Sequence, residues 1–393
     1  MSGSAREVFA AFLKLGLTSF GGPIAHLGYF REAFVVRRRW LDESAFAELV
    51  SLCQFLPGPS SSQVGFAIGW LRAGPFGALA AWTAFTLPSA LLMTAIALSA
   101  TALHGGVTGG LVHGLKLVAV AVVAQAVFGM ARTLTPDARR AGIALLAAGI
   151  VVFAGAFAGQ IAAIAIGVAL GLLLCREQSA APSPAAVLNI SRRAGLVAGV
   201  VFVAVLAGGP LLAVAAGDPA LAHFNAFYRS GALVFGGGHV VLPLLQQAVV
   251  APGWISQDSF LAGYGAAQAL PGPLFTFAAY LGAALQQPPN GVAGAALALA
   301  AIFLPGILAL IAVLPFWNWL RAHPAAQAAI AGANAAVVGI LGAALYDPIW
   351  TSAVHSKRDA LGAAIGFTLL TAFRAPPVVV VALGAAYGLL LSY

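Results

Sequence analysis

A short polar stretch, "CQFLPGPSSSQ" at 53–63, interrupts an otherwise strongly apolar chain. Pro57 and Pro59 remove two amide donors and disfavour helix for the residue before each, and Gly58 between them supplies a flexible pivot. Pro59 also suits the first turn of a new helix, which would begin with "SSSQ" at 60–63. A helix start of this kind presents free backbone N–H groups and about half a positive charge. The stretch therefore predicts a site that binds a small anion without a formal cation.

The same tetrad, "LPGP", returns at 270–273 behind another glutamine. Gln54 and Gln268 both lie about one turn ahead of their breaks, where we expect them to act as neutral hydrogen-bonding groups. Two glycine-rich stretches, "FGGP" at 20–23 and "FGGGH" at 235–239, would supply further bare backbone that a ligand can approach closely. The sequence thus predicts two pairs of broken helices whose ends enclose a small anion.

Several charged residues lie close to these stretches. Lys14 and Arg229 occupy matching positions, and a cation buried in a membrane costs about 2.5–3.5 kcal/mol on insertion scales, which favours a functional role. The alternative is snorkelling to the interface. Arg31 is expected to be topogenic, yet it is near enough to the first break to serve as an entry cation. His26 and His239 are interpreted as packing or hydrogen-bonding residues, with a proton relay as the alternative.

The candidate substrate-binding residues form one set drawn from both halves of the chain. They are Ser60, Ser61, Ser62, Gln63, Gly58, Gln54, Gln268, Gly272, Gly21, Gly22, Gly236, Gly237, Lys14, Arg229 and Arg31.

Composition places these residues in a membrane. Of 393 residues, 61% are hydrophobic and only 8% are charged, whereas soluble domains carry about 25% charge. Long apolar runs suit helical spans, and alternating ten-residue strands are absent, so we expect an all-α polytopic integral membrane protein. The net charge of +8 is explained by topogenic arginines beside anionic lipid rather than by nucleic acid.

The chain also contains an internal repeat. "FLKLGLTSFGGPIAHL" at 12–27 aligns with "FYRSGALVFGGGHVVL" at 227–242, and the "LPGP" tetrads follow at nearly the same offset. Farther on, "TLPS" at 86–89 matches "FLPG" at 303–306 in its Leu-Pro pair. The predicted organisation is a first transporter repeat at 1–175, a polar linker with one unpaired transmembrane helix at 176–221, and a second repeat at 222–393.

One extra helix between the repeats would turn the second repeat upside down, a common plan for secondary transporters. If 8–30 and 44–70 are re-entrant hairpins, every Lys and Arg before residue 194 except Lys116 falls on one face. The positive-inside rule makes this face cytoplasmic. The simpler alternative is a set of Pro-kinked helices with Gly packing faces; matched breaks in two repeats favour a binding site.

The stretches "SFGGPIAHLGYFREAFVVRRRWLDE", "QFLPGPSSSQVGFAIG", "FGGGHVVLPLL" and "QALPGPLFTFAAYLG" resemble the chromate ion transporter family in its long, two-domain form. The resemblance covers essentially the whole chain. It implies two antiparallel homologous halves in a bacterial inner membrane, and export of chromate driven by the proton motive force, which gives chromate resistance. Sulfate is the close chemical analogue. The second repeat departs from the first, with "GPLFT" in place of "GPSSS", so we expect the first copy to hold the anion more directly.

The expected partners are therefore an inorganic oxyanion, protons as coupling ion and the lipid bilayer, with a homodimer among the possibilities and without nucleic acid. The runner-up function is a sulfate or other anion permease, or a passive anion channel. A membrane-embedded enzyme is the least favoured class, because the sequence has no HExxH, Cys/His metal cluster or paired carboxylates in a predicted cavity. Neither a cofactor nor a metal is expected.

Overall fold

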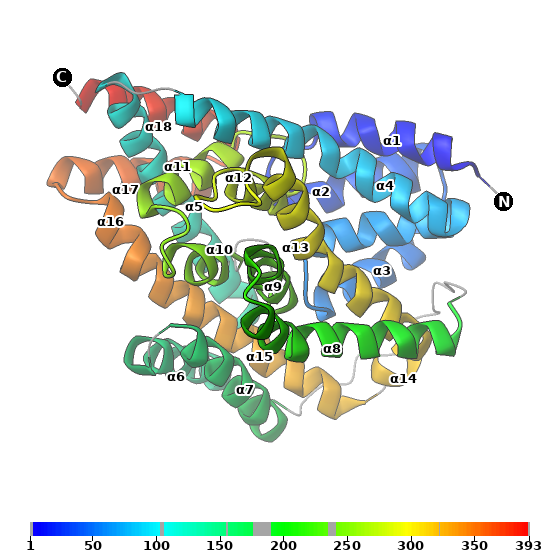
Figure 1. Ribbon diagram of the computed structural model, residues 1–393. Coiled ribbons are helices and arrows are strands. Elements are labelled where there is room, and N and C mark those ends of the chain that lie inside the picture. Colours follow the sequence, from blue (N-terminus) through cyan, green and yellow to red (C-terminus); the bar gives the residue numbers. More distant parts are fainter. Residues whose placement is uncertain are drawn as a thin grey trace. The chain divides into compact units, whose positions relative to one another are not determined.

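The computed structural model describes residues 3–102, 106–154, 156–175, 190–234, 241–321 and 323–391. Throughout these ranges the regular structure is helical, with no strand (Figure 1). Among the described residues, five stretches are long and apolar enough to cross a membrane, namely Ser60–Ser99, Gly109–Leu134, Arg192–Ala216, Gly291–Phe316 and Pro324–Ala353. The expected all-α polytopic membrane architecture is confirmed.

The chain divides into two compact units, and each draws on both halves of the sequence. Unit 1 comprises Met1–Leu98, Ala181–Val241 and Leu270–Ala322. Unit 2 comprises Ser99–Ala180, Leu242–Ala269 and His323–Tyr393. The spatial units therefore cut across the sequence halves at 1–175 and 222–393, so residues far apart in the chain meet within one unit.

Unit 1 contains most of the predicted breaks. Its helices are α1 (Ala5–Thr18), α2 (Gly22–Phe30), the π-helix η1 (Arg31–Arg37), α3 (Glu43–Phe55), α4 (Ser60–Ala102, of which the last residues belong to unit 2), α8 (Arg192–Ala216), α9 (Pro219–Ala232), the 3-10 turn η4 (Leu274–Thr276), α12 (Phe277–Ala283), α13 (Gly291–Val313), the 3-10 turn η5 (Leu314–Phe316) and α14 (Trp317–Arg321).

The break predicted from "LPGP" is confirmed. Helix α3 ends at Phe55 and α4 begins at Ser60, so the four residues between them are non-helical. A second interruption lies inside α4, where Ala73 and Gly74 leave the helical region and the helix resumes at Pro75. Residues 60–72 are thus a short half-helix, and a membrane-crossing helix follows. The first hairpin also breaks as expected, with Gly21 in the left-handed region before α2.

An aromatic cluster holds the broken helices of unit 1 together. Phe12 of α1 stacks on Phe34 of η1 at 4.7 Å between ring centroids, and Phe30 of α2 meets Phe85 of α4 edge-on at 5.1 Å. All four rings are buried. Because aromatic pairs bury large areas in fixed geometry, this cluster fixes the position of α4 relative to the α1–α2 break.

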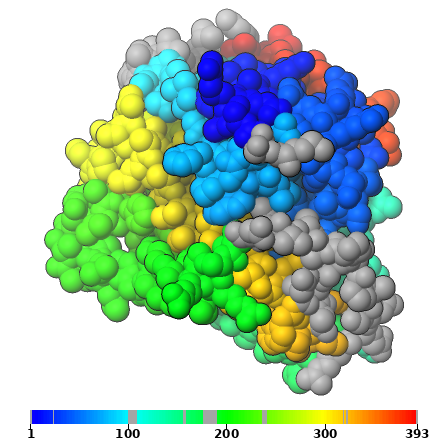
Figure 2. Space-filling model, turned by 90° about the vertical axis from the view of Figure 1, so that its right-hand side faces the viewer, coloured from blue at the N-terminus to red at the C-terminus, as the bar shows by residue number. Residues whose placement is uncertain are grey.

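Helix α8 corresponds to the predicted unpaired segment and lies at the surface of the chain (green, Figure 2). Only 6% of its apolar window is buried, and its outer face carries large side chains such as Val200, Leu211 and Val214. In water such an apolar surface would be costly. On a membrane helix it is the surface expected to face lipid, while α9 and α13 pack against the other side.

Unit 2 contains α5 (Gly106–Leu134), α6 (Ala138–Ala154), α7 (Ala156–Leu174), α10 (Val241–Leu245), the π-helix η3 (Gln246–Val250), α11 (Gln257–Ala267), α15 (Pro324–Ala344), the π-helical segment η6 (Leu345–Trp350), α16 (Thr351–Ala353), α17 (Lys357–Thr371) and α18 (Pro377–Leu391).

Two long helices of unit 2 each pack against the terminal hairpin of the other sequence half. Helix α5 lies against α17 and α18, and α15 lies against α6 and α7. Glycines allow the close approach: Gly114 meets Gly384, and Gly332 meets Gly167 and Gly171. Small residues at such crossings let the helix backbones come together, as is common in membrane helices.

Candidate functional site

The start of α4 is the helix end that the sequence predicts. The first intrahelical bond is donated by the Gln63 amide to the Pro59 carbonyl at 3.0 Å, so the amides of 60–62 precede it and have no acceptor in the helix. Ser61, Ser62 and Gln63 are buried. A buried helix end leaves backbone donors and a partial positive charge in a low-dielectric surrounding, where both attract an anion.

Gln63 stabilises the non-helical segment between α3 and α4 and connects it to α13. Its Nε2 donates to the carbonyl of Pro57 at 2.9 Å and to the carbonyl of Gly306 in α13 at 2.8 Å. Gly58 takes a φ of +116°, and a Cβ there would lie 2.8 Å from the Cα of Gly306. Only glycine fits this position without moving α13. The amide of Gly58 completes the arrangement by donating to the Val234 carbonyl at 2.8 Å.

The second "LPGP" makes the corresponding contacts with the first half of the chain. The amide of Gly272 donates to the Ser19 carbonyl at 2.9 Å. A Cβ on Gly272, whose φ is +97°, would lie 2.8 Å from Ser89 Oγ. In the repeat alignment Ser19 matches Val234, and Ser89 matches Gly306. The Gly58 loop contacts Val234 and Gly306 of the second half, and the Gly272 loop contacts Ser19 and Ser89 of the first half. The two loops therefore make equivalent contacts.

His26 of α2 links the α4 start to this second loop. Its Nδ1 lies 3.3 Å from Ser61 Oγ, and its ring packs edge-on against Phe85 with centroids 5.2 Å apart. The Phe85 carbonyl lies 3.3 Å from the Cβ position of Gly272. Phe85 thus contacts His26 and also borders the Gly272 loop, so both breaks belong to one local cluster in unit 1.

This cluster carries buried polar atoms that find no hydrogen-bond partner within the described chain. They are Ser19 Oγ, His26 Nε2, Ser62 Oγ, Gln63 Oε1 and Thr86 Oγ1. Leaving one such group unsatisfied costs about 1–3 kcal/mol, and a buried site that concentrates several is unusual. Hydroxyl and imidazole groups can donate to an anion's oxygens, so the cluster has the chemistry of an oxyanion site without a formal cation.

The other predicted ligands lie elsewhere. Lys14 and Gln54 are exposed, and Arg31 is exposed and bonded to Glu43 at 2.6 Å. Arg229 is half-buried in α9. Gln268 belongs to unit 2, where its Nε2 is buried without a partner in the described chain.

Of the predicted glycine ligands in the two glycine-rich stretches, the structure describes those of the first stretch and not those of the second. Gly21 and Gly22 form the α1–α2 break with positive φ. Gly236, Gly237 and His239 lie outside the described residues.

Besides His26, interpreted from the sequence as a packing or hydrogen-bonding residue, three residues of the cluster do not appear among the predicted ligands. Ser19 directly precedes the "FGGP" stretch, and Thr86 and Ser89 flank the Leu-Pro pair of "TLPS". In the sequence the Leu-Pro pair serves only to align the two repeats. Its position beside the Gly272 loop depends on tertiary packing, which the sequence pattern does not give. Ser89 Oγ donates to the Thr86 carbonyl at 3.2 Å, so of these two side chains Thr86 has the free hydroxyl.

The two copies differ in the way the sequence predicts. After the second "LPGP" the chain forms only the turn η4 and the seven-residue α12. Its hydroxyl, Thr276 Oγ1, donates to the Pro273 carbonyl at 2.8 Å. The first loop is thus followed by the unpartnered Ser62 hydroxyl, whereas the Thr276 hydroxyl after the second loop is bonded. Within the described residues no group of three His, Cys, Asp or Glu side chains is placed to hold a metal ion.

Comparisons with known proteins give the family. The family model described as "Chromate transporter" matches residues 6–174 and 221–389. The chromate transport protein of Pseudomonas aeruginosa is 28% identical over 97% of this chain and 90% of its own length. A probable chromate transport protein of Synechococcus elongatus is 26% identical over 87% and 84% of the two chains, and an uncharacterised transporter of Methanocaldococcus jannaschii is 27% identical over 81% and 78%. No solved structure matches. The chain belongs to the chromate transporter family.

Proposed function

We propose that the protein is a secondary active transporter that exports chromate from the bacterial cytoplasm across the inner membrane, driven by the proton motive force, and so confers chromate resistance. The observation that carries the proposal is the set of buried side-chain atoms in unit 1 that have no partner in the described chain, together with an α4 start whose first amides have no acceptor in the helix. The relatives named as chromate transport proteins supply the substrate class.

A tetrahedral dianion suits these donors. Its four oxygens accept hydrogen bonds in several directions, which matches the hydroxyl of Ser19 after the end of α1, the hydroxyls of α4 and the first backbone amides of the half-helix 60–72. Because the described residues of the cluster include no formal cation, binding rests on a helix end and neutral donors. Such a site holds an anion without trapping it, and a transporter must also release its substrate. Sulfate has the same shape and charge, and is the expected competitor.

We further propose that the two sequence halves are inverted repeats. Three features support this arrangement: the single helix α8 between them, the arginines gathered on one expected face, and the corresponding contacts of Gly58 and Gly272 across the halves. In transporters of this plan, broken helices at the repeat interface form the substrate site. The α4 start and the Gly272 loop of unit 1 are the elements that we assign to this site.

The decisive experiment is transport of labelled chromate in vesicles that contain the purified chain. Flux should depend on an imposed pH gradient, and unlabelled sulfate should reduce it. Absence of chromate flux in either direction would remove the proposed substrate while leaving the fold unaffected. Flux that ignores the gradient would instead support a passive anion pathway.

Ser62→Ala and Thr86→Val test the site itself. Each change removes an unpartnered buried hydroxyl, so we expect thermal stability to be unchanged or slightly higher. If the hydroxyl donates to a dianion, the KM for chromate should rise about tenfold or more, since bonds to charged groups are worth about 1.5–3 kcal/mol.

Thr94→Val is the matched control, because the Thr94 hydroxyl in the same helix already donates to the Ala90 carbonyl at 2.8 Å. Its transport should match the parent. Unchanged KM in both site variants would show that the α4 start does not bind the substrate.

A further inference from the structure

Unit 2 contains a buried cation that the site in unit 1 does not use. Lys116 lies in the apolar span Gly109–Leu134 of α5, and its side chain is only 9% exposed. Lysines near the ends of membrane helices normally extend to the interface. A buried one is costly, rare and, as a rule, functional. In the expected topology Lys116 is also the one Lys or Arg before residue 194 that does not fall on the cytoplasmic face, so topogenesis does not explain it.

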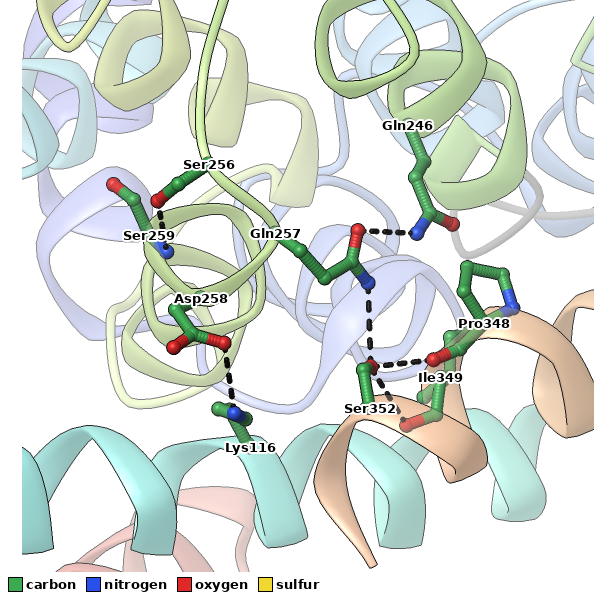
Figure 3. A network of polar contacts seen from close by, with 9 residues as sticks. All are labelled: Lys116, Gln246, Ser256, Gln257, Asp258, Ser259, Pro348, Ile349 and Ser352. Atoms are coloured by element: carbon green, nitrogen blue, oxygen red, sulfur yellow. Dashed lines mark hydrogen bonds and ion pairs between the residues drawn. The ribbon is translucent and has the colours of Figure 1, made fainter. Parts of the chain in front are cut away.

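The partner of Lys116 is Asp258, in the first turn of α11. The Lys116 Nζ lies 2.8 Å from Asp258 Oδ1 (Figure 3). The two side chains differ sharply in exposure, because that of Asp258 is 65% exposed. The carboxylate can therefore turn outward to water, whereas the ammonium remains where it is. Once the carboxylate has turned away, the buried ammonium is left without this partner.

Neutral groups fix the backbone beside this pair. Gln257, next to Asp258, accepts from Gln246 Nε2 at 2.7 Å and donates to Ser352 Oγ at 3.3 Å (Figure 3). Ser352 in turn donates to the Pro348 carbonyl. This chain of bonds ties the start of α11 to η3 and to α16, so the backbone that carries Asp258 is held by contacts that do not involve the Asp258 side chain.

We propose that Lys116 forms a second anion site, which the Asp258 carboxylate fills in the described state and which a tetrahedral dianion fills in its place during transport. The proposal rests on the proposed function, since it assumes that the dianion crosses this protein. Asp258 acts as an internal substitute for the substrate: it keeps the buried cation paired between passages and must leave for the dianion to bind. Lys116 contributes the formal charge that the unit 1 cluster lacks.

A permanently structural ion pair would lead to a different expectation. Such a pair gains most when both partners are desolvated and fully hydrogen-bonded, and an exposed pair contributes little. The Lys116–Asp258 pair is neither fully buried nor fully exposed, because it combines a buried cation with an exposed anion. This asymmetry suits exchange of the anion.

The test measures whether an anion protects this position. In the full chain with Cys175→Ser, Asp258→Cys introduces an accessible thiol beside Lys116, while native Cys53 is fully buried. A negatively charged methanethiosulfonate reagent should modify residue 258, and sulfate, which does not oxidise thiols, should slow the reaction several-fold. Lys116→Gln should abolish the protection, and Lys116→Arg, which keeps the charge, should restore it.

The matched control is Glu43→Cys in the first turn of α3. Glu43 pairs with Arg31 at 2.6 Å, but both side chains are exposed, at 58% and 51%. Sulfate should not slow modification of residue 43. Protection at 258 that is absent, or that is equal in the Lys116→Gln variant, would overturn the proposal.

A second measurement covers the case in which a cysteine variant folds poorly. Asp258→Asn removes the competing carboxylate, so equilibrium binding of labelled sulfate to the purified chain should tighten relative to the parent. Weaker or unchanged binding in a folded variant contradicts the exchange. Chromate flux in the parent is measured separately: its absence would remove the proposed function, while sulfate protection at 258 would still establish the site.

Discussion

The candidate site depends on a few atoms whose hydrogen bonds are not made within the described chain. Ser62 Oγ, Thr86 Oγ1 and His26 Nε2 are buried and unpartnered, and each reduces stability while it remains so. Such groups persist where function requires them, because a ligand that satisfies them recovers the lost free energy. Gln63 differs: both hydrogens of its Nε2 have carbonyl partners, and it holds the loop in place.

Gly58→Ala and Gly272→Ala should both destabilise the protein, because each glycine combines a positive φ with close contact to the other half of the chain. A side chain in a strained backbone region costs about 1–3 kcal/mol. At Gly58 the added Cβ also meets backbone, the Cα of Gly306, which cannot move without α13. Thermal unfolding in detergent should show the larger loss for Gly58→Ala.

Gly74→Ala separates the cost of backbone strain from the cost of the steric contact. Gly74 has a φ of +64°, but a Cβ there meets nothing within 4 Å. Its loss of stability should reflect the backbone strain alone and be the smallest of the three. If Gly58→Ala were as mild as Gly74→Ala, the close contact with α13 would be wrong.

The helices of unit 2 depend on close crossings between elements. In α15, Gly332 packs directly on Gly167 and Gly171 of α7, whereas Gly342 of the same helix has nothing within 4 Å of its Cβ position. Gly332→Leu should therefore separate α15 from α7 and cost several kcal/mol, about the upper range for overpacking. Gly342→Leu should change stability by less than about 1 kcal/mol. Equal effects on the unfolding temperature would exclude this crossing.

The start of α17 is held by a carboxylate, which predicts a pH dependence. Asp359 is buried, accepts from the His355 amide at 3.0 Å, and lies 2.8 Å from His113 Nε2 of α5. Burial alone raises the pKa of the Asp359 carboxyl, but the hydrogen bonds from His113, His355 and Ser356 outweigh it, so the pKa lies below its usual value. The stabilising contribution is therefore fully present above the ordinary pKa of about 3.9 and is lost as pH falls through the lowered value.

Unfolding curves of the parent should show no loss from this source between pH 7 and about pH 4 and a progressive loss below the ordinary pKa of about 3.9, and Asp359→Asn should lack it. Ser191→Ala is the control, because it removes the N-cap of α8 and costs about 1 kcal/mol at every pH without changing any hydrogen bond of Asp359. An Asp359→Asn variant with the pH profile of the parent would show that this carboxylate does not carry the effect.

The whole chain makes a topological prediction. If the halves are inverted, Arg37 and Gly253 occupy opposite sides of the membrane. Cysteines placed there singly, in a chain with Cys175→Ser, should react with a membrane-impermeant reagent from opposite sides of oriented vesicles. Both positions are exposed in the structure, so accessibility itself is not limiting. Labelling from the same side would refute the inverted arrangement.

Much of the architecture could be predicted from the sequence because it depends on local chemistry. Proline lacks an amide donor and disfavours helix before it, so the break at 56–59 and the restart at Ser60 could be read directly. The length of an apolar run likewise indicates whether a helix can cross the bilayer, since the thickness of the hydrocarbon core sets the number of residues needed. The absence of serines after the second "LPGP" likewise leaves that loop with one hydroxyl, that of Thr276, which bonds within its own turn.

Only the tertiary structure decided which residues meet. Gln63 bonds to the Gly306 carbonyl across 243 positions, Lys116 pairs with Asp258 across 142, and His26 reaches Ser61 across 35. These contacts depend on how helices cross, which is set by the summed packing of many side chains and not by any one motif. The sequence alone therefore determined where the helices break and what donors they expose, and the packing of the units decided which distant residues surround those donors.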